Sequence, residues 1–113
     1  VLSASDGDNI LDGGTGADTI RSGSGVDTIV IRAGDGSSTL ASADVITDFE
    51  DGADLFGTVI GLVFADLSVE QGTGSNSNDT LVSITATGEY LAIVEGINAT
   101  ALTEADFTPV EIL

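Results

Sequence analysis

The 113-residue chain contains no cysteine, histidine, lysine, methionine or tryptophan. These absences exclude disulfides, thiolate nucleophiles, histidine-based catalytic triads, Schiff-base lysines and zinc sites of the usual ligands. Only two basic residues, Arg21 and Arg32, stand against 19 acidic ones, and the formal charge is −17. Nucleic-acid binding needs positive charge along a groove, so we expect no nucleic-acid partner.

Long apolar runs are also absent. No stretch approaches the roughly 18 apolar residues that span a membrane, and no N-terminal signal peptide is visible, so we expect no membrane insertion. Because the sequence has no methionine, we expect it to be a piece of a longer protein. Its length suits one domain, or a repeat array with a cap. A mean hydropathy of +0.34 argues against disorder, which combines low hydrophobicity with high net charge.

The first third of the chain contains a nine-residue repeat, in units that run over 4–12, 13–21 and 22–30. Three columns recur in register. The fourth position is glycine, the sixth is Asn or Asp and the eighth is aliphatic: Gly7, Gly16, Gly25; Asn9, Asp18, Asp27; Leu11, Ile20, Ile29. The pattern is lost after Gly34 and resumes with Asp44 and Ile46, beyond a Ser/Thr/Ala-rich stretch.

Each unit combines a glycine-rich turn with a short strand. One unit cannot bury its aliphatic side chain alone, so we expect the units to stack with Leu11, Ile20 and Ile29 inside. A flexible linker would not keep these aliphatics in register, and a phosphate-binding loop would need a third glycine and a following helix.

Stacking also brings the sixth-position carboxylates together. At ~5 Å and an effective dielectric constant near 20, each pair repels by roughly 3 kcal/mol. Two arginines are too few to offset this repulsion, so the sequence predicts a bound cation. Carboxylate and carbonyl oxygens of a flexible turn form a hard, all-oxygen site that favours Ca²⁺ over Mg²⁺ or a transition metal.

The unit at 13–21, G-G-T-G-A-D-T-I-R, matches every defined position of G-G-x-G-x-D-x-U-x. It resembles the nonapeptide of the RTX proteins (repeats-in-toxin, with haemolysin-type calcium-binding repeats). The resemblance implies an all-β fold, a short parallel β-roll of calcium-binding nonapeptide repeats capped by antiparallel C-terminal strands. It also implies that calcium binds between units two apart. One site would use Ser5, Gly7 and Asn9 with Ser22, Ser24 and Asp27; a second would use Gly14, Gly16 and Asp18, closed near Ala33 or by Asp44; a third would involve Gly23 and Gly25.

The segment 44–54, D-V-I-T-D-F-E-D-G-A-D, resembles the end of the β-roll in the C-terminal domains of serralysin-like proteases and alginate epimerases. The resemblance implies that Phe49 closes the last coil as a hydrophobic plug and that Asp44 is a calcium ligand. Asp48 and Asp54 are either ligands or turn-capping carboxylates. We assign residues 1–56 to the β-roll and 57–113 to a C-terminal β cap that carries a secretion signal.

The second half of the chain reads as this cap, and its apolar strands would supply the core that three repeats lack. Its predicted elements are a turn or strand at 62–67 leading into 68–70, a loop at 72–78, a hairpin of 80–85 with 90–94, a helical turn at 102–107 and a last strand at 110–113. We expect Phe64, Tyr90 and Phe107 in the core.

The last three residues, Glu111-Ile112-Leu113, resemble the uncleaved C-terminal signal of type I (ABC-transporter) secretion, which RTX proteins use. We therefore expect the calcium-binding C-terminal module of a larger secreted bacterial protein, folded by extracellular calcium and exported by the type I secretion apparatus. The alternative is a module that binds a polysaccharide or a surface, as part of an extracellular enzyme or adhesin. We expect no enzyme, because the carboxylates stand in metal-ligand register and not in a glycosidase-like pair.

Overall fold

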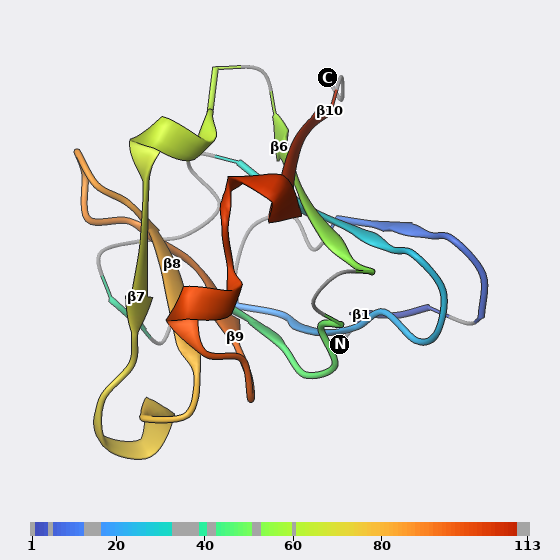
Figure 1. The fold of residues 1–113 in the computed structure, drawn as a ribbon, viewed down its shortest axis with the longest axis horizontal. Helices are drawn as coiled ribbons and strands as arrows, with labels where there is room; N and C mark the ends of the chain where they lie inside the picture. The colour runs from blue at the N-terminus through green and yellow to red at the C-terminus, as the bar shows by residue number, and fades with distance from the viewer. Residues whose placement is uncertain are drawn as a thin grey trace.

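The computed structural model describes residues 2–4, 6–12, 17–32, 39–40, 43–50, 53–59 and 61–110. Over these ranges the chain forms ten strands and several 3₁₀ turns, with no α-helix (Figure 1). No helix in this described part is therefore long and apolar enough to cross a membrane.

The strands form two sheets. The first sheet has six strands in the order β1 (Leu2–Ser3), β3 (Thr19–Arg21), β5 (Asp44–Ile46), β9 (Tyr90–Val94), β8 (Thr80–Ile84) and β7 (Leu67–Gln71). The second has four in the order β10 (Phe107–Val110), β6 (Leu55–Val59), β4 (Thr28–Ile31) and β2 (Ile10–Leu11).

The register of the first strands is that of a parallel β-roll. β1 pairs with β3 and places Leu2 beside Ile20, while β2 pairs with β4 and places Leu11 beside Ile29. Each pairing joins residues two repeat units apart, so two nine-residue units make one coil, and the predicted fold class is confirmed. The next coil is longer, because Ile20 pairs with Ile46, which lies 26 residues further along the chain.

The aliphatic column of the repeat lines the inside of the roll. The exposed fractions of Leu11, Ile20 and Ile29 are 4%, 0% and 1%. Ile46 and Phe56 continue the two columns in β5 and β6 and are also fully buried, at 0%. Burial of each such side chain contributes about 1.5–3 kcal/mol, which explains why the aliphatics keep their register.

A row of stacked phenylalanine rings joins the last coil to the cap. Phe49 is 5% exposed and lies 4.9 Å from Phe56, centroid to centroid, and Phe56 lies 5.3 Å from Phe107. Phe64 contacts the other side of Phe107 at 5.0 Å. The predicted burial of Phe49 is therefore confirmed, whereas Phe64, Phe107 and Tyr90 are only half-buried.

The cap extends both sheets of the roll. β9 pairs in parallel with β5, β10 pairs in parallel with β6, and β7 and β8 add antiparallel strands to the first sheet. The predicted hairpin is present as β8 and β9, with a bulge at Val82/Ser83 and a positive φ of 74° at Gly88. The division at residues 56 and 57 stays a prediction; β6 runs across it.

Two similar segments of the cap each form a capped 3₁₀ turn followed by a strand. They read L-V-F-A-D-L-S from Leu62 and L-T-E-A-D-F-T from Leu102. The Asp106 carboxylate accepts a 2.8 Å hydrogen bond from the Thr103 amide, which closes the turn Glu104–Asp106. The strand then starts at Phe107, so the predicted strand at 110–113 was placed too late, and residues 111–113 lie outside the described part.

Candidate calcium-binding turns

Three turns of the roll follow β1, β3 and β5, and their described residues are 4 and 6–9, 22–27, and 47–50 with 53–54. The first two lie side by side at the right of Figure 1. Gly7 and Gly25 occupy equivalent positions in them, with φ of 101° and 99°, values that favour glycine. A Cβ added to Gly25 would lie only 2.5 Å from the Gly7 carbonyl oxygen. The two turns are thus in direct backbone contact.

The sixth-position carboxylates form a ladder between coils. Asp27 Oδ1 accepts a 2.9 Å hydrogen bond from the backbone amide of Asn9, and Asp54 Oδ1 accepts one of 3.0 Å from that of Asp27. On the opposite edge of the roll, Asp44 Oδ1 accepts a 2.8 Å hydrogen bond from the Asp18 amide. Each of these carboxylates therefore binds a backbone amide of the preceding coil.

Burial makes these carboxylates unusual. Asp27 and Asp54 are 0% exposed and Asp44 is 9% exposed. The second oxygens of Asp18 and Asp27, both Oδ2, are buried and accept no hydrogen bond from the described residues. A buried anionic oxygen without a partner is costly, and a hard cation is the partner that satisfies it. The donor set of carboxylates and turn carbonyls fits Ca²⁺.

Four of the predicted ligands, Ser5, Gly14, Gly16 and Ala33, lie outside the described residues. Among the rest, the structure gathers one group at the first two turns and one pair on the opposite edge: Gly7, Asn9, Ser22, Gly23, Ser24, Gly25 and Asp27; Asp18 and Asp44. Nowhere in the described residues do three acidic side chains converge on a common centre. A calcium ion here would therefore take most of its ligands from backbone carbonyls, as the predicted sets do.

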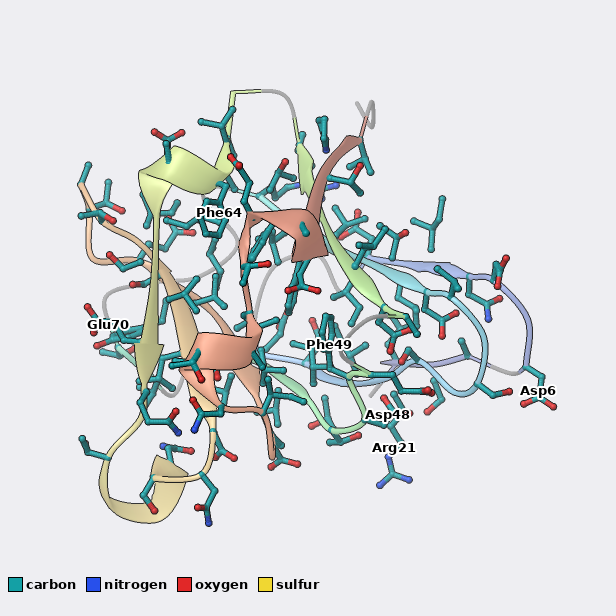
Figure 2. The ribbon with its side chains drawn as sticks, viewed as in Figure 1. Asp6, Arg21, Asp48, Phe49, Phe64 and Glu70 are labelled. Carbon is teal, nitrogen blue, oxygen red and sulfur yellow. The ribbon has the colours of Figure 1, made fainter. Side chains whose placement is uncertain are left out.

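The third turn attaches to the second through Asp48 and Asp54. Asp48 accepts hydrogen bonds of 2.8 Å and 3.0 Å from the amides of Ser22 and Gly23, and the buried Ser22 hydroxyl donates to both carboxylates. Asp54 also accepts from the Glu50 amide of its own turn. These contacts match the turn-capping alternative. Figure 2 labels Asp48 beside this junction.

The place of Asp54 in the ladder was missed, although the sequence contains a signal for it. Asp54 precedes Phe56 by two residues, as Asp27 precedes Ile29. Phe56 pairs with Ile29 in the sheet, so the segment 54–56 is one more copy of the acid-then-apolar pair. The pair is hard to recognise because Phe56 stands where the repeats have an aliphatic residue.

A comparison with protein families matches residues 1–29 to the RTX calcium-binding nonapeptide repeat (4 copies). Residues 1–29 are RTX repeats. They comprise the first two turns and the strands from β1 into β4, the same segments whose register defines the roll. A comparison with curated proteins found no match. RTX repeats bind calcium, and the family therefore agrees with the donor set of the buried carboxylates.

Arg32 is the one basic residue with a close acidic partner among the described contacts of the roll. Its Nη2 lies 2.6 Å from Asp12 Oδ2, with both side chains about one-third exposed. Exposed pairs of this kind contribute at most about 1 kcal/mol. The pair cannot offset the charge of the buried ladder.

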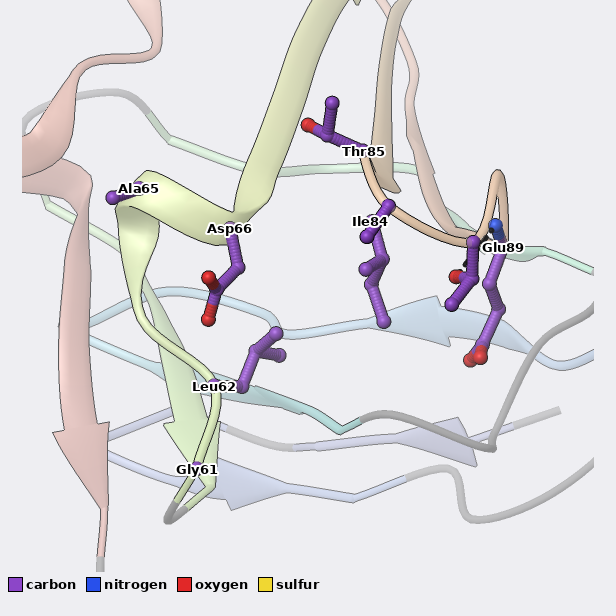
Figure 3. Close-up of a pocket in the computed structure, with 9 residues that line it drawn as sticks. Gly61, Leu62, Ala65, Asp66, Ile84, Thr85 and Glu89 are labelled. Atoms are coloured by element: carbon purple, nitrogen blue, oxygen red, sulfur yellow. Dashed lines mark hydrogen bonds between the residues drawn. The ribbon is translucent and has the colours of Figure 1, made fainter.

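A separate cavity of about 370 Å³ lies in the cap (Figure 3). Its walls include Leu62 and Ile84, which face it from two elements, and the carboxylates of Asp66 and Glu89. The Asp66 side chain is already engaged, because its Oδ2 accepts from the Val63 amide. None of the lining residues is aromatic.

Proposed function

We propose that the chain is a calcium-triggered folding module of a larger secreted bacterial protein, exported by a type I secretion system and active outside the cell. One observation carries this proposal. Asp27 is fully buried, and within the described part of the chain its Oδ2 has no hydrogen-bond partner. A protein that has to carry this buried charge is stable only when a cation satisfies it.

In the absence of calcium, a chain with 19 acidic and two basic residues repels itself. This repulsion favours an extended state, which suits passage through a narrow exporter. A bound calcium ion supplies the positive charge that the stack lacks. Asp27 and the carbonyls of the glycine turns would hold one such ion, and Asp18 on the opposite edge would hold another. Asp44 and Asp54 accept hydrogen bonds from the backbone amides of Asp18 and Asp27.

The proposed switch depends on the calcium concentration on each side of the membrane. Extracellular calcium modules bind at about 10⁻⁴ to 10⁻³ M, so such a site is empty in the cytosol and filled outside. Because calcium binds the folded state only, its binding free energy becomes folding free energy. We assign the export signal to Glu111-Ile112-Leu113.

The polysaccharide-binding alternative would need an exposed aromatic platform. Four of the five aromatic side chains instead contact one another: Phe49, Phe56, Phe64 and Phe107. The cavity of Figure 3 has no aromatic wall, and the aromatic side chains that line a second pocket, Phe64 and Phe107, belong to this ring cluster. These observations favour the calcium module.

Export and folding can be tested separately. For export, the chain is fused to a reporter in cells with a type I exporter, with and without its last three residues. We expect the reporter in the medium only for the complete chain. For folding, far-UV circular dichroism is recorded in chelator, in calcium and in magnesium. We expect a β signal in calcium alone, and the same spectrum in all three solutions would refute the switch.

A further inference from the structure

The junction between the first and second turns is held by direct hydrogen bonds. Asp8 Oδ1 accepts a 2.9 Å bond from the Val26 amide, and the Ser24 hydroxyl donates to Asp6 Oδ1 at 2.7 Å. Figure 2 places Asp6 at the outer tip of the first turn. In these two contacts, a donor of the second turn therefore meets an acceptor of the first.

The side chain of Asn9 lies at the centre of this junction. Its Nδ2 donates to the Gly7 carbonyl at 3.0 Å and to Asp27 Oδ1 at 3.2 Å. The Asn9 backbone amide donates to the same oxygen of Asp27 at 2.9 Å. Both neighbours of Nδ2 are acceptors, so only the nitrogen end of the amide can face them.

Asn9 differs from the other sixth-position residues of the repeats. Asp18 and Asp27 each have a buried carboxylate oxygen that accepts no hydrogen bond from the described residues. At Asn9, by contrast, a neutral donor bridges a turn carbonyl and the carboxylate of the next coil. These two oxygens, Gly7 O and Asp27 Oδ1, are of the kinds that calcium takes as ligands.

We propose that the Asn9 amide takes the place of a calcium ion at the first junction, so that the first coil docks on the second without metal. This inference rests on the proposed function for the remaining sites. The amide supplies two hydrogen bonds where a cation would supply charge, and calcium loading begins at the next junction. The predicted calcium site of Gly7, Asn9 and Asp27 is therefore filled by the chain itself.

A carboxylate at position 9 would reverse this arrangement. Its oxygen would face the Gly7 carbonyl and Asp27 Oδ1, so that three oxygens meet without the side-chain donor, and only the backbone amide of residue 9 still donates to Asp27 Oδ1. A cation bound among these three oxygens would offset their repulsion. Asn9→Asp should create a calcium site that the natural chain lacks.

The test counts calcium ions by equilibrium dialysis at saturating calcium, in the natural chain, Asn9→Asp and Asn78→Asp. Asn78 is exposed in the loop before β8, so its variant makes the same charge change away from the roll. We expect Asn9→Asp to bind one ion more than the natural chain, and Asn78→Asp to bind the same number. A third variant, Asn9→Ala, removes the bridging donor without adding a ligand, and we expect an unchanged ion count with a lower melting temperature.

A second readout is the dependence of the unfolding free energy on the logarithm of calcium concentration, whose slope reports the ions released on unfolding. The slope should rise by one ion in Asn9→Asp alone. Equal counts and slopes for the natural chain and Asn9→Asp would overturn the proposal, as would failure of Asn9→Asp to fold in any calcium concentration. If the natural chain binds no calcium, the proposed function fails, and the Asn9→Asp count still decides this inference.

Discussion

The contact between Gly25 and Gly7 predicts unequal effects of two otherwise matched substitutions. Both glycines have φ near 100°, so an alanine at either position suffers the same backbone strain, about 1–2 kcal/mol. The loss of unfolded-chain entropy is also the same in both variants. The surroundings differ, however. Among the described residues, a Cβ at Gly7 meets nothing within 4 Å, whereas a Cβ at Gly25 lies 2.5 Å from the Gly7 carbonyl oxygen.

Gly25→Ala must therefore separate the two turns, because a backbone atom cannot rotate away. Overpacking of this kind costs about 1–3 kcal/mol beyond the shared strain. A domain of this size is stable by about 5–15 kcal/mol, so the difference between the two variants is measurable.

The assay is urea unfolding of Gly7→Ala and Gly25→Ala at saturating calcium, with the free energy of unfolding extrapolated to water and the slopes compared. We expect Gly25→Ala to be less stable than Gly7→Ala by about 1–3 kcal/mol with equal slopes. If the two variants have equal stability, the turns do not touch, and the stacking described here is wrong.

Three further changes test other parts of the structure. Asp27→Asn should weaken calcium binding by about tenfold or more, roughly 1.4 kcal/mol, because it replaces a buried charged ligand by a neutral one. Calorimetric titration against exposed Glu70→Gln checks this, and equal affinities would contradict it. Phe56→Ala should lower the free energy of unfolding by about 3–5 kcal/mol, because Phe56 is fully buried. Val63→Ala, at a site 55% exposed, should change it by less than about 0.5 kcal/mol. If both variants lose the same free energy of unfolding, the ring stack is not part of the core. Asp106→Ala should cost about 1 kcal/mol through the lost cap at Thr103, and an unchanged melting temperature would show that the cap is not important.

The repeat itself made the roll predictable. A period of nine with aliphatics at one position allows burial in only one way, and Leu11, Ile20 and Ile29 lie where that argument places them. The hairpin of β8 and β9 could be predicted equally well, because the alternation of apolar and polar residues and a glycine turn are local signals. The position of the last strand was not, since it depends on the contact of Phe107 with Phe56, which is distant in sequence.

The candidate site was predictable in composition but not in connection. The sequence identified Asp18, Asp27 and Asp44 from their register. It could not reveal that each carboxylate of the ladder accepts from a backbone amide of the preceding coil, because that contact exists only once the coils stack. For the same reason, the bridging position of the Asn9 amide depends on the approach of two turns that are separated along the chain.

If calcium makes this anionic chain collapse, small-angle X-ray scattering can measure the collapse directly. The folded chain has a Cα radius of gyration of 12.5 Å. An unfolded chain of this length has one of about 34 Å. We predict a value near that of the unfolded chain in chelator and a fall to near the folded value as calcium is added, with no such fall in magnesium. A chain that is equally compact in chelator and in calcium would contradict the account.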